Sequence, residues 1–91
     1  MDKLHKNITV SGLVQGVGFR FSCSKMAKAL GLKGYVRNLY NDGVYVEVEG
    51  AEPQINKLID WCKKGSALAR VSDIEVTMSS LKHYSYFEIK H

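Results

Sequence analysis

Residues 7–31, with the sequence NITVSGLVQGVGFRFSCSKMAKALG, contain the pattern that decides the fold. The β-branched residues Ile8, Val10 and Val14 fit a period of two, which predicts a strand over residues 7–14. Two glycines then interrupt the alternation in residues 15–19, which predicts a loop. From about residue 20 to residue 30 the apolar side chains follow helical spacing, and a glycine at position 31 is placed to end the helix. This segment is therefore predicted to be one strand–loop–helix unit.

A β-hairpin is predicted to follow this unit. Residues 34–40 are expected to form a second strand, and residues 44–48 alternate valine with tyrosine or glutamate as a third strand. The turn between them, Asn41-Asp42-Gly43, contains the residues that hairpin turns favour.

The remaining chain is expected to supply a second helix and two more strands. The helix begins near Glu52, with Pro53 in its first turn, and Gly65 ends it. Residues 71–78 and residues 84–90 are predicted to be strands.

The predicted order of elements is β-α-β-β-α-β followed by an extra C-terminal strand. This is an α+β fold of the ferredoxin-like, split βαβ type, a sandwich in which two helices cover one face of an antiparallel sheet. Alternating polar residues on the strands lead us to expect that the other face is open to solvent. With 91 residues, the chain is expected to form a single domain over residues 1–91.

The composition is that of an ordinary globular protein, with 45% hydrophobic and 24% charged residues. No apolar run approaches the roughly 18 residues that a membrane span needs, and residues 1–6 lack a signal-peptide core, so we expect a cytoplasmic protein without a membrane partner. The net charge of +4 suits an anionic ligand. The basic residues form no stripe, so nucleic acid is not the expected partner.

Three predicted loops meet at one end of this fold. The loop of residues 15–19 follows the first strand, Asn38 lies near the end of the second strand, and residues 65–71 follow the second helix. These three elements run in the same direction in a split βαβ fold, so their ends are expected to lie together. We therefore expect the functional site at that end.

The loop of residues 15–19 has the physical properties of an anion site. Gly16 and Gly18 permit positive φ, so that successive N–H groups can point inward as a nest. The loop leads into a helix N-terminus, which favours negative charge, and the planar guanidinium of Arg20 can hold two phosphate oxygens at once. On these residues alone, a plain strand-to-helix turn with a solvated arginine remains an equal alternative.

Two named phosphate motifs are excluded. The dinucleotide fingerprint requires a third glycine where this chain has Phe21, and no Gly-Lys-Ser/Thr follows the loop, as an ATPase P-loop requires.

Three motifs resemble those of the acylphosphatase family. Residues 12–20, GLVQGVGFR, are similar to its first signature, G-x-V-Q-G-V-x-F-R. Residues 34–38, GYVRN, are similar to the second signature, which ends in asparagine, and residues 87–89, FEI, match the family's F-x-I terminus. The resemblance covers nearly the whole chain, and the chain length is that of the stand-alone enzyme.

The resemblance implies hydrolysis of acyl phosphates to a carboxylate and inorganic phosphate, without a metal or cofactor. It implies that Arg20 binds the phosphate, that Asn38 orients the attacking water, and that backbone amides cradle the phosphate. The cradle residues are Gln15, Gly16, Val17, Gly18 and Phe19. The chemistry agrees, because a carboxylate leaves without protonation and no general acid is needed. We expect a monomer whose product, inorganic phosphate, is also an inhibitor.

Two positions depart from the family pattern. Gly43 lies five residues after Asn38, where four is usual, which puts the type of the hairpin turn in doubt. Ser66 stands where the family commonly has proline, so the loop after the second helix is expected to be more mobile.

The remaining candidate residues are assigned structural roles. Cys23 and Cys62 occupy equivalent helical positions and are expected to be reduced, buried thiols that lie near each other, with a disulfide as the alternative. His5, His83 and His91 are expected to be exposed and to form no metal site.

Arginines and tyrosines on the predicted strands are the last candidates. Arg70 is expected to add positive potential near the site, and Arg37 is expected to be solvated. Tyr40, Tyr84 and Tyr86 are expected to pack on the strand surface.

Two other functions are alternatives to an acylphosphatase enzyme. An RNA-binding ferredoxin-like module is disfavoured because the first strand has no aromatic residue. A regulatory domain that binds phosphate or carbamoyl phosphate without turnover is known within larger carbamoyl-transfer proteins, but only two residues follow Ile89 here.

Overall fold

The computed structural model describes residues 2–91, and its elements follow the predicted order. In chain order they are β1 (Lys3–Leu13), α1 (Phe19–Ala29), β2 (Lys33–Asn38), β3 (Val44–Ala51), α2 (Glu52–Lys64), β4 (Arg70–Ser79) and β5 (Phe87–Lys90). β1 begins earlier than predicted because Lys3 still pairs with Ala51 of β3. The final strand is shorter than predicted and begins at Phe87.

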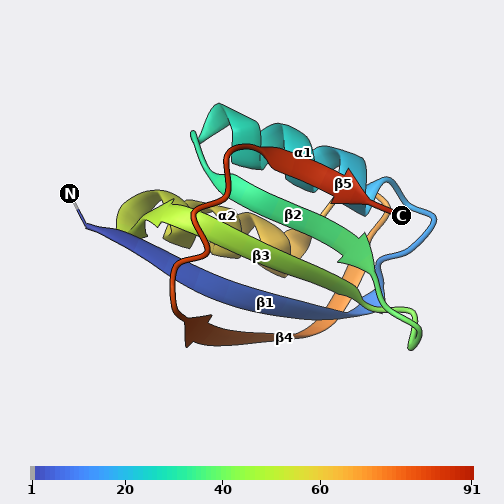
Figure 1. Cartoon of the computed structure of the whole chain (residues 1–91). Helices are drawn as coiled ribbons and strands as arrows, with labels where there is room; N and C mark the ends of the chain where they lie inside the picture. The colour runs from blue at the N-terminus through green and yellow to red at the C-terminus, as the bar shows by residue number, and fades with distance from the viewer. Residues whose placement is uncertain (1) are drawn as a thin grey trace.

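The five strands form one sheet in the order β4-β1-β3-β2-β5. Pairing is antiparallel among the first four strands, as predicted. The extra C-terminal strand differs, because β5 pairs in parallel with β2 and makes the sheet mixed. The connection from β4 crosses the sheet before β5 begins, so β5 starts at the same end as β2 (Figure 1).

Both helices cover the same face of the sheet, as predicted (Figure 1). Each helix turns a buried stripe toward the strands, with Cys23 and Ala27 in α1 and Leu58 and Cys62 in α2. These side chains pack against valine and isoleucine residues of β1, β2 and β3 to form the core. Burying one such side chain stabilises the fold by about 1.5–3 kcal/mol. Gly65 ends α2, as predicted.

Neither of the two described helices is long and apolar enough to cross a membrane.

The opposite face of the sheet was expected to be open to solvent, and this is wrong over β3. Residues 80–86, here called the strap, cross this face between β4 and β5 (Figure 1). Glu47 and Glu49 of β3 are only 6% and 4% exposed as a result. The backbone N–H groups of Lys82 and Tyr84 both donate hydrogen bonds to the Glu49 carboxylate. The strap is therefore fixed to the sheet by buried carboxylates.

His5 was expected to be exposed, and the structure corrects this too. Its side chain is buried beneath the strap. Its Nδ1 lies 2.7 Å from Glu49 Oε2, and its Nε2 lies 2.9 Å from Asn7 Oδ1, both at hydrogen-bonding distance. A Glu47 oxygen lies 3.1 Å from the same Nε2. Because β1 and β3 are neighbouring strands, the His5 ring is buried between the carboxylates of Glu47 and Glu49, which are far from it in sequence.

Glu47 accepts hydrogen bonds from side chains of β2, β3 and the strap. The hydroxyls of Tyr35 and Tyr45 each donate to it at 2.9 Å, and that of Tyr84 donates at 2.8 Å. The ammonium of Lys82 lies 3.2 Å away. Burial alone would raise the pKa of Glu47, but these donors outweigh it and lower the pKa to about 2. Burial and the same carboxylate raise the pKa of Tyr45 to about 12.

Of the three tyrosines expected on the strand surface, Tyr84 packs as predicted, with its ring 6.0 Å from that of Tyr35. Tyr40 lies in the turn between β2 and β3 and is fully exposed, so that prediction is wrong. Tyr86, at the end of the strap, is 62% exposed.

Candidate active site

The loop between β1 and α1 adopts the conformation that its glycines predict. Gly16 has φ of 74° and Gly18 has φ of 77°, both in the left-handed region that glycine favours. Gly18 is also the N-cap residue that immediately precedes α1, and its carbonyl accepts from Ser22 N–H at 3.1 Å. In the described chain, no backbone N–H from residue 15 to residue 18 donates to another backbone group. The loop therefore retains open donors at a helix N-terminus.

Two side chains fix this loop from either side. The amide of Gln15 donates to the carbonyls of Leu39 and Gly43, each at 2.8 Å, and so joins the loop to the turn between β2 and β3. The hydroxyl of Ser66 donates to the carbonyl of Val17 at 2.8 Å. The loop of residues 15–19 therefore contacts both of the other segments that were predicted to lie at this end. The Ser66 contact anchors the loop in which greater mobility was expected, and that mobility stays a prediction.

Arg20 lies in the first turn of α1, and its guanidinium contacts the last two residues of the chain. Its Nη1 lies 3.3 Å from the carbonyl oxygen of Lys90 and 3.3 Å from Nδ1 of His91. A guanidinium has five N–H donors, so these contacts leave others free for an anion. The parallel pairing of β5 with β2 brings these terminal residues to the site, and sequence reasoning missed them. His91 is exposed, as predicted, but only the position of β5 in the sheet could have indicated its contact with Arg20.

Asn38 is the last residue of β2, and its side chain carries an unusual feature. Within residues 2–91, its Oδ1 is buried and has no hydrogen-bond partner. An unpaired buried acceptor costs about 1–3 kcal/mol, so such an atom is typical of a site that a ligand or water completes.

A shallow cavity of about 260 Å³ brings these groups together. Its lining contains the predicted residues Gly16, Gly18, Phe19, Arg20 and Asn38. Val14, Phe21, Ile89 and His91 also line it and were not predicted as site residues. Gln15 and Val17 do not line the cavity, because their side chains support the loop instead.

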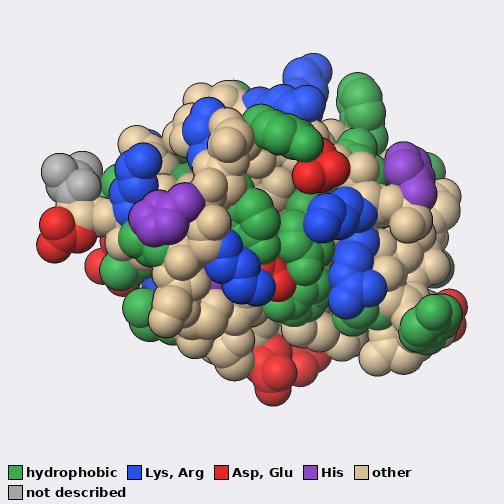
Figure 2. Space-filling model, viewed as in Figure 1, with side chains coloured by type: hydrophobic (Ala, Val, Ile, Leu, Met, Phe, Trp, Pro, Cys, Tyr) green, Lys and Arg blue, Asp and Glu red, His purple; other side chains and the backbone are tan. Residues whose placement is uncertain are grey.

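The two further arginines do not line this cavity. Arg37 is exposed, as predicted, and its guanidinium lies 5.4 Å from the ring centroid of Tyr45. Arg70 is exposed at the start of β4. Figure 2 shows Lys and Arg side chains spread in separate groups over the strap face, which agrees with the absence of a basic stripe in the sequence.

Cys23 and Cys62 are free, buried thiols, as predicted. A hydrogen bond with Cys62 and burial together raise the pKa of Cys23, which keeps it protonated and unreactive. Residues 2–91 contain no group of three or more His, Cys, Asp or Glu side chains placed to hold a metal ion.

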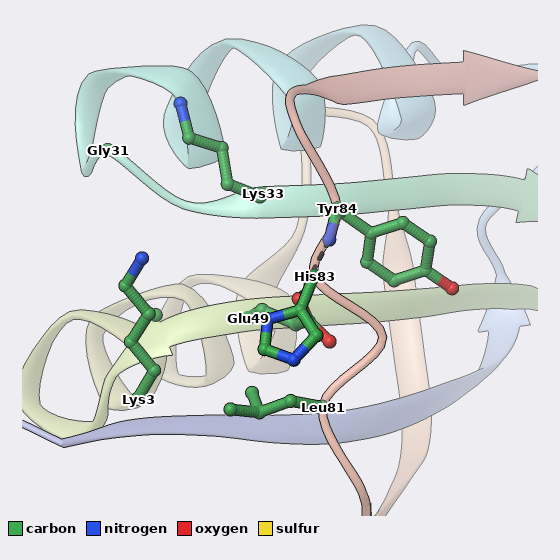
Figure 3. A pocket seen from close by; sticks show the side chains of 8 residues that line it. Lys3, Gly31, Lys33, Glu49, Leu81, His83 and Tyr84 are labelled. Atoms are coloured by element: carbon green, nitrogen blue, oxygen red, sulfur yellow. Dashed lines mark hydrogen bonds between the residues drawn. The ribbon is translucent and has the colours of Figure 1, made fainter.

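A second hollow, of about 150 Å³, lies beneath the strap at the other end of β3. Lys3, Lys33 and His83 surround it, and Glu49 and Tyr84 lie together at its side (Figure 3). The carboxylate of Glu49 already accepts hydrogen bonds from two backbone N–H groups of the strap and contacts His5.

Comparisons with known proteins agree with this geometry. The family model described as acylphosphatase matches residues 6–89. A curated acylphosphatase from Acaryochloris marina is 46% identical over 80 residues, which cover 88% of this chain and 86% of the relative. The crystal structure of acylphosphatase from Bacillus subtilis matches with a TM-score of 0.94 and 37% identity, covering 97% of this chain and 99% of that one.

The fold also occurs within a larger protein. The crystal structure of full-length HypF, in a phosphate- and nucleotide-bound form, matches with a TM-score of 0.89 and 33% identity. That match covers 99% of this chain but 12% of HypF. The family match over most of the chain and the near-complete overlap with stand-alone relatives lead to one conclusion: this chain belongs to the acylphosphatase family and is an enzyme that hydrolyses acyl phosphates.

Proposed function

We propose that this acylphosphatase holds the phosphoryl group of its substrate between the backbone amides of residues 15–19 and the guanidinium of Arg20, and that Asn38 orients the attacking water. The observation that carries the proposal is the single cavity that Gly16, Gly18, Arg20 and Asn38 share. The open amides supply donors for phosphate oxygens, and the unpartnered Oδ1 of Asn38 supplies an acceptor for a water proton.

These groups suffice for the reaction. The water oxygen, held by Asn38, attacks phosphorus as the bond from phosphorus to the acyl oxygen breaks. The bonding electron pair leaves with the carboxylate, which is a weak base and needs no proton at neutral pH. The proton of the water passes to a phosphate oxygen. Arg20 and the amides stabilise the charge that spreads over the phosphoryl oxygens, and their fixed positions avoid reorganisation during the reaction.

We further propose that the chain acts as a single acylphosphatase domain, as a monomer, in the reducing cytosol. All the proposed groups come from one chain, and its two cysteines are free thiols. The alternative of a phosphate-binding domain without turnover draws on the likeness to HypF. The much fuller overlap with stand-alone relatives supports the separate enzyme instead.

Hydrolysis of benzoyl phosphate tests the assignment of Arg20. We expect turnover that a chelator does not change, competitive inhibition by inorganic phosphate, and a loss of about 10³-fold or more in kcat/KM for Arg20→Ala. Arg20→Lys retains charge but not the two-pronged geometry, so it should recover only a small part. Arg37→Ala removes an arginine outside the cavity and serves as the matched control, with activity near wild type. Full activity in Arg20→Ala would remove this arginine from the mechanism.

A further inference from the structure

Phe21 is a large aromatic side chain exposed beside the proposed phosphate site. It is 68% exposed and lines the same cavity as Arg20 and Asn38. Exposed apolar side chains are common singly on protein surfaces, so exposure alone carries no function. Phe21 differs from a singly exposed side chain because it forms part of the wall of the cavity that Arg20 and Asn38 also line.

Three neighbouring side chains in the first turn of α1 point in different directions: Phe19, Arg20 and Phe21. Successive helical residues are rotated by about 100° around the axis, so Phe19 and Phe21 are about 200° apart, with Arg20 between them. Phe19 points into the core, where it is 1% exposed and its ring lies 5.0 Å from that of Trp61. Phe21 therefore faces outward, on the side of the cavity that opens to solvent.

The cavity has a polar part and an apolar part. Gly16, Gly18, Arg20 and Asn38 form the part that suits a phosphoryl group. Apolar side chains supply much of the rest, and no Asp or Glu among residues 2–91 lines it. Of these apolar residues, Phe21 is exposed and Ile89 is half-buried, so both remain accessible to a bound molecule.

Among residues 2–91, Arg20 is the only Lys or Arg that lines this cavity. Two basic side chains near the same end of the sheet, those of Arg37 and Lys90, are directed at aromatic rings of the strap face. Arg37 lies over Tyr45, and the Lys90 ammonium lies 4.2 Å from the ring centroid of Tyr35. The hydroxyls of these tyrosines donate to Glu47 beneath the strap. Within the lining of this cavity, a substrate with a second carboxylate would therefore find no basic residue beyond Arg20 and His91.

We propose that Phe21 and Ile89 form the wall against which the acyl group packs, and that this enzyme selects acyl phosphates with uncharged apolar or aromatic acyl groups over those that carry a second carboxylate. The inference rests on the proposed phosphate site, because that site fixes which end of the substrate meets Phe21. An apolar contact of roughly 40 Å² corresponds to a preference of about fivefold.

Three substrates and four variants test this wall. The substrates are benzoyl phosphate, acetyl phosphate and 4-carboxybenzoyl phosphate, which share the reacting bond and differ only in the acyl group. The variants are Phe21→Ala, Phe21→Leu, Phe21→Lys and Tyr86→Ala. Tyr86 is a matched control because it is 62% exposed and does not line the cavity.

Wild type is expected to prefer benzoyl over acetyl phosphate in kcat/KM. Phe21→Ala should reduce that ratio about fivefold, through KM with kcat little changed, and Phe21→Leu should retain most of it. Phe21→Lys should shift the preference toward 4-carboxybenzoyl phosphate by placing a cation in the wall. Tyr86→Ala should leave every ratio unchanged.

An equal effect of Phe21→Ala on benzoyl and acetyl phosphate would overturn the inference, as would a wild-type preference for the carboxylated substrate. The test reads a ratio between substrates, whereas the proposed roles of Arg20 and Asn38 are read from the absolute rates of their own variants. The two can therefore fail separately.

Discussion

Polar groups are buried both under the strap and at the active-site end. Those under the strap are hydrogen-bonded within the chain, whereas a buried acceptor at the active-site end is not. Under the strap, Glu47 accepts from three tyrosine hydroxyls and faces Lys82, and both ring nitrogens of His5 lie at hydrogen-bonding distance from a partner. At the other end, within residues 2–91, the buried Oδ1 of Asn38 has no partner, and the amides of residues 15–18 donate to no backbone group. The polar groups of the strap network are therefore paired within the chain, whereas Asn38 Oδ1 and the loop amides are left open to a ligand.

The physical reason for this difference is the free energy of an unpaired polar group. A buried donor or acceptor without a partner destabilises the folded state by about 1–3 kcal/mol. A group retained in that state is therefore expected to act on something outside the chain. The comparison predicts that activity and stability respond to different residues.

The largest effect that separates the two regions is expected at Asn38. Asn38→Ala should lower kcat for benzoyl phosphate by about 10²–10³-fold, because the water loses its acceptor. The free energy of unfolding should not fall, because no hydrogen bond within the protein is lost. Parallel assays of turnover and urea unfolding measure both. A stability loss that matches the loss of activity would assign Asn38 a structural role instead.

The next effect is expected at Glu47, where a substitution should change stability and leave activity unchanged. Glu47→Gln should lower the free energy of unfolding by about 3 kcal/mol, because it removes a buried charge that many donors were arranged to meet. Activity of the folded enzyme should stay near wild type. Glu75→Gln changes an exposed glutamate of β4 and should alter stability by no more than about 0.5 kcal/mol. Equal stability of the two variants would show that the strap network does not hold the fold.

The pH dependence of stability sharpens the same point. The folded pKa of Glu47 is lowered to about 2 from an ordinary value of 4.5, and hydrogen bonds from His5 and the strap also lower the pKa of Glu49 against its burial. Between these values the unfolded chain binds more protons than the folded chain. The stability contributed by these carboxylates is therefore complete above about pH 4.5 and is lost as the pH falls toward 2. Urea midpoints at pH 7, 4 and 3 should fall more steeply for wild type than for Glu47→Gln.

The smallest of these effects is expected at the C-terminus. His91→Ala removes one of the two contacts to Arg20 Nη1, while the carbonyl of Lys90 remains. Looser positioning of the guanidinium should lower kcat/KM about tenfold and weaken inhibition by inorganic phosphate. Stability should not change, because the residue is exposed. An unchanged inhibition constant for phosphate would show that His91 does not position Arg20.

Local signals in the sequence were enough to predict most of the fold and much of the site. The periods of two and 3.6 located the strands and helices, and the glycines at 16 and 18 predicted the positive φ that the loop adopts. The open acceptor of Asn38 could not be predicted, because pairing depends on the surroundings of each atom. The role of His91 was missed because it depends on the parallel pairing of a four-residue strand after a long connection.

The burial of His5 was missed for a related reason. Glu47 and Glu49 alternate with valines, which is the pattern of a strand with one face in solvent. That face is instead covered by the strap, which is more than 30 residues away along the chain. Contacts of this kind follow from the path of the whole chain and leave no local pattern.

Titration of ¹⁵N-labelled protein with inorganic phosphate, followed by NMR, tests the central claim most directly. Saturable shifts are predicted for the backbone amides of residues 15–19, the Nε–H of Arg20 and the side-chain amide of Asn38, with little change in the strap or in residues around Lys3 and Lys33. Shifts confined to that second region, or no saturable shift in residues 15–19, would contradict the assignment of this loop as the phosphate site.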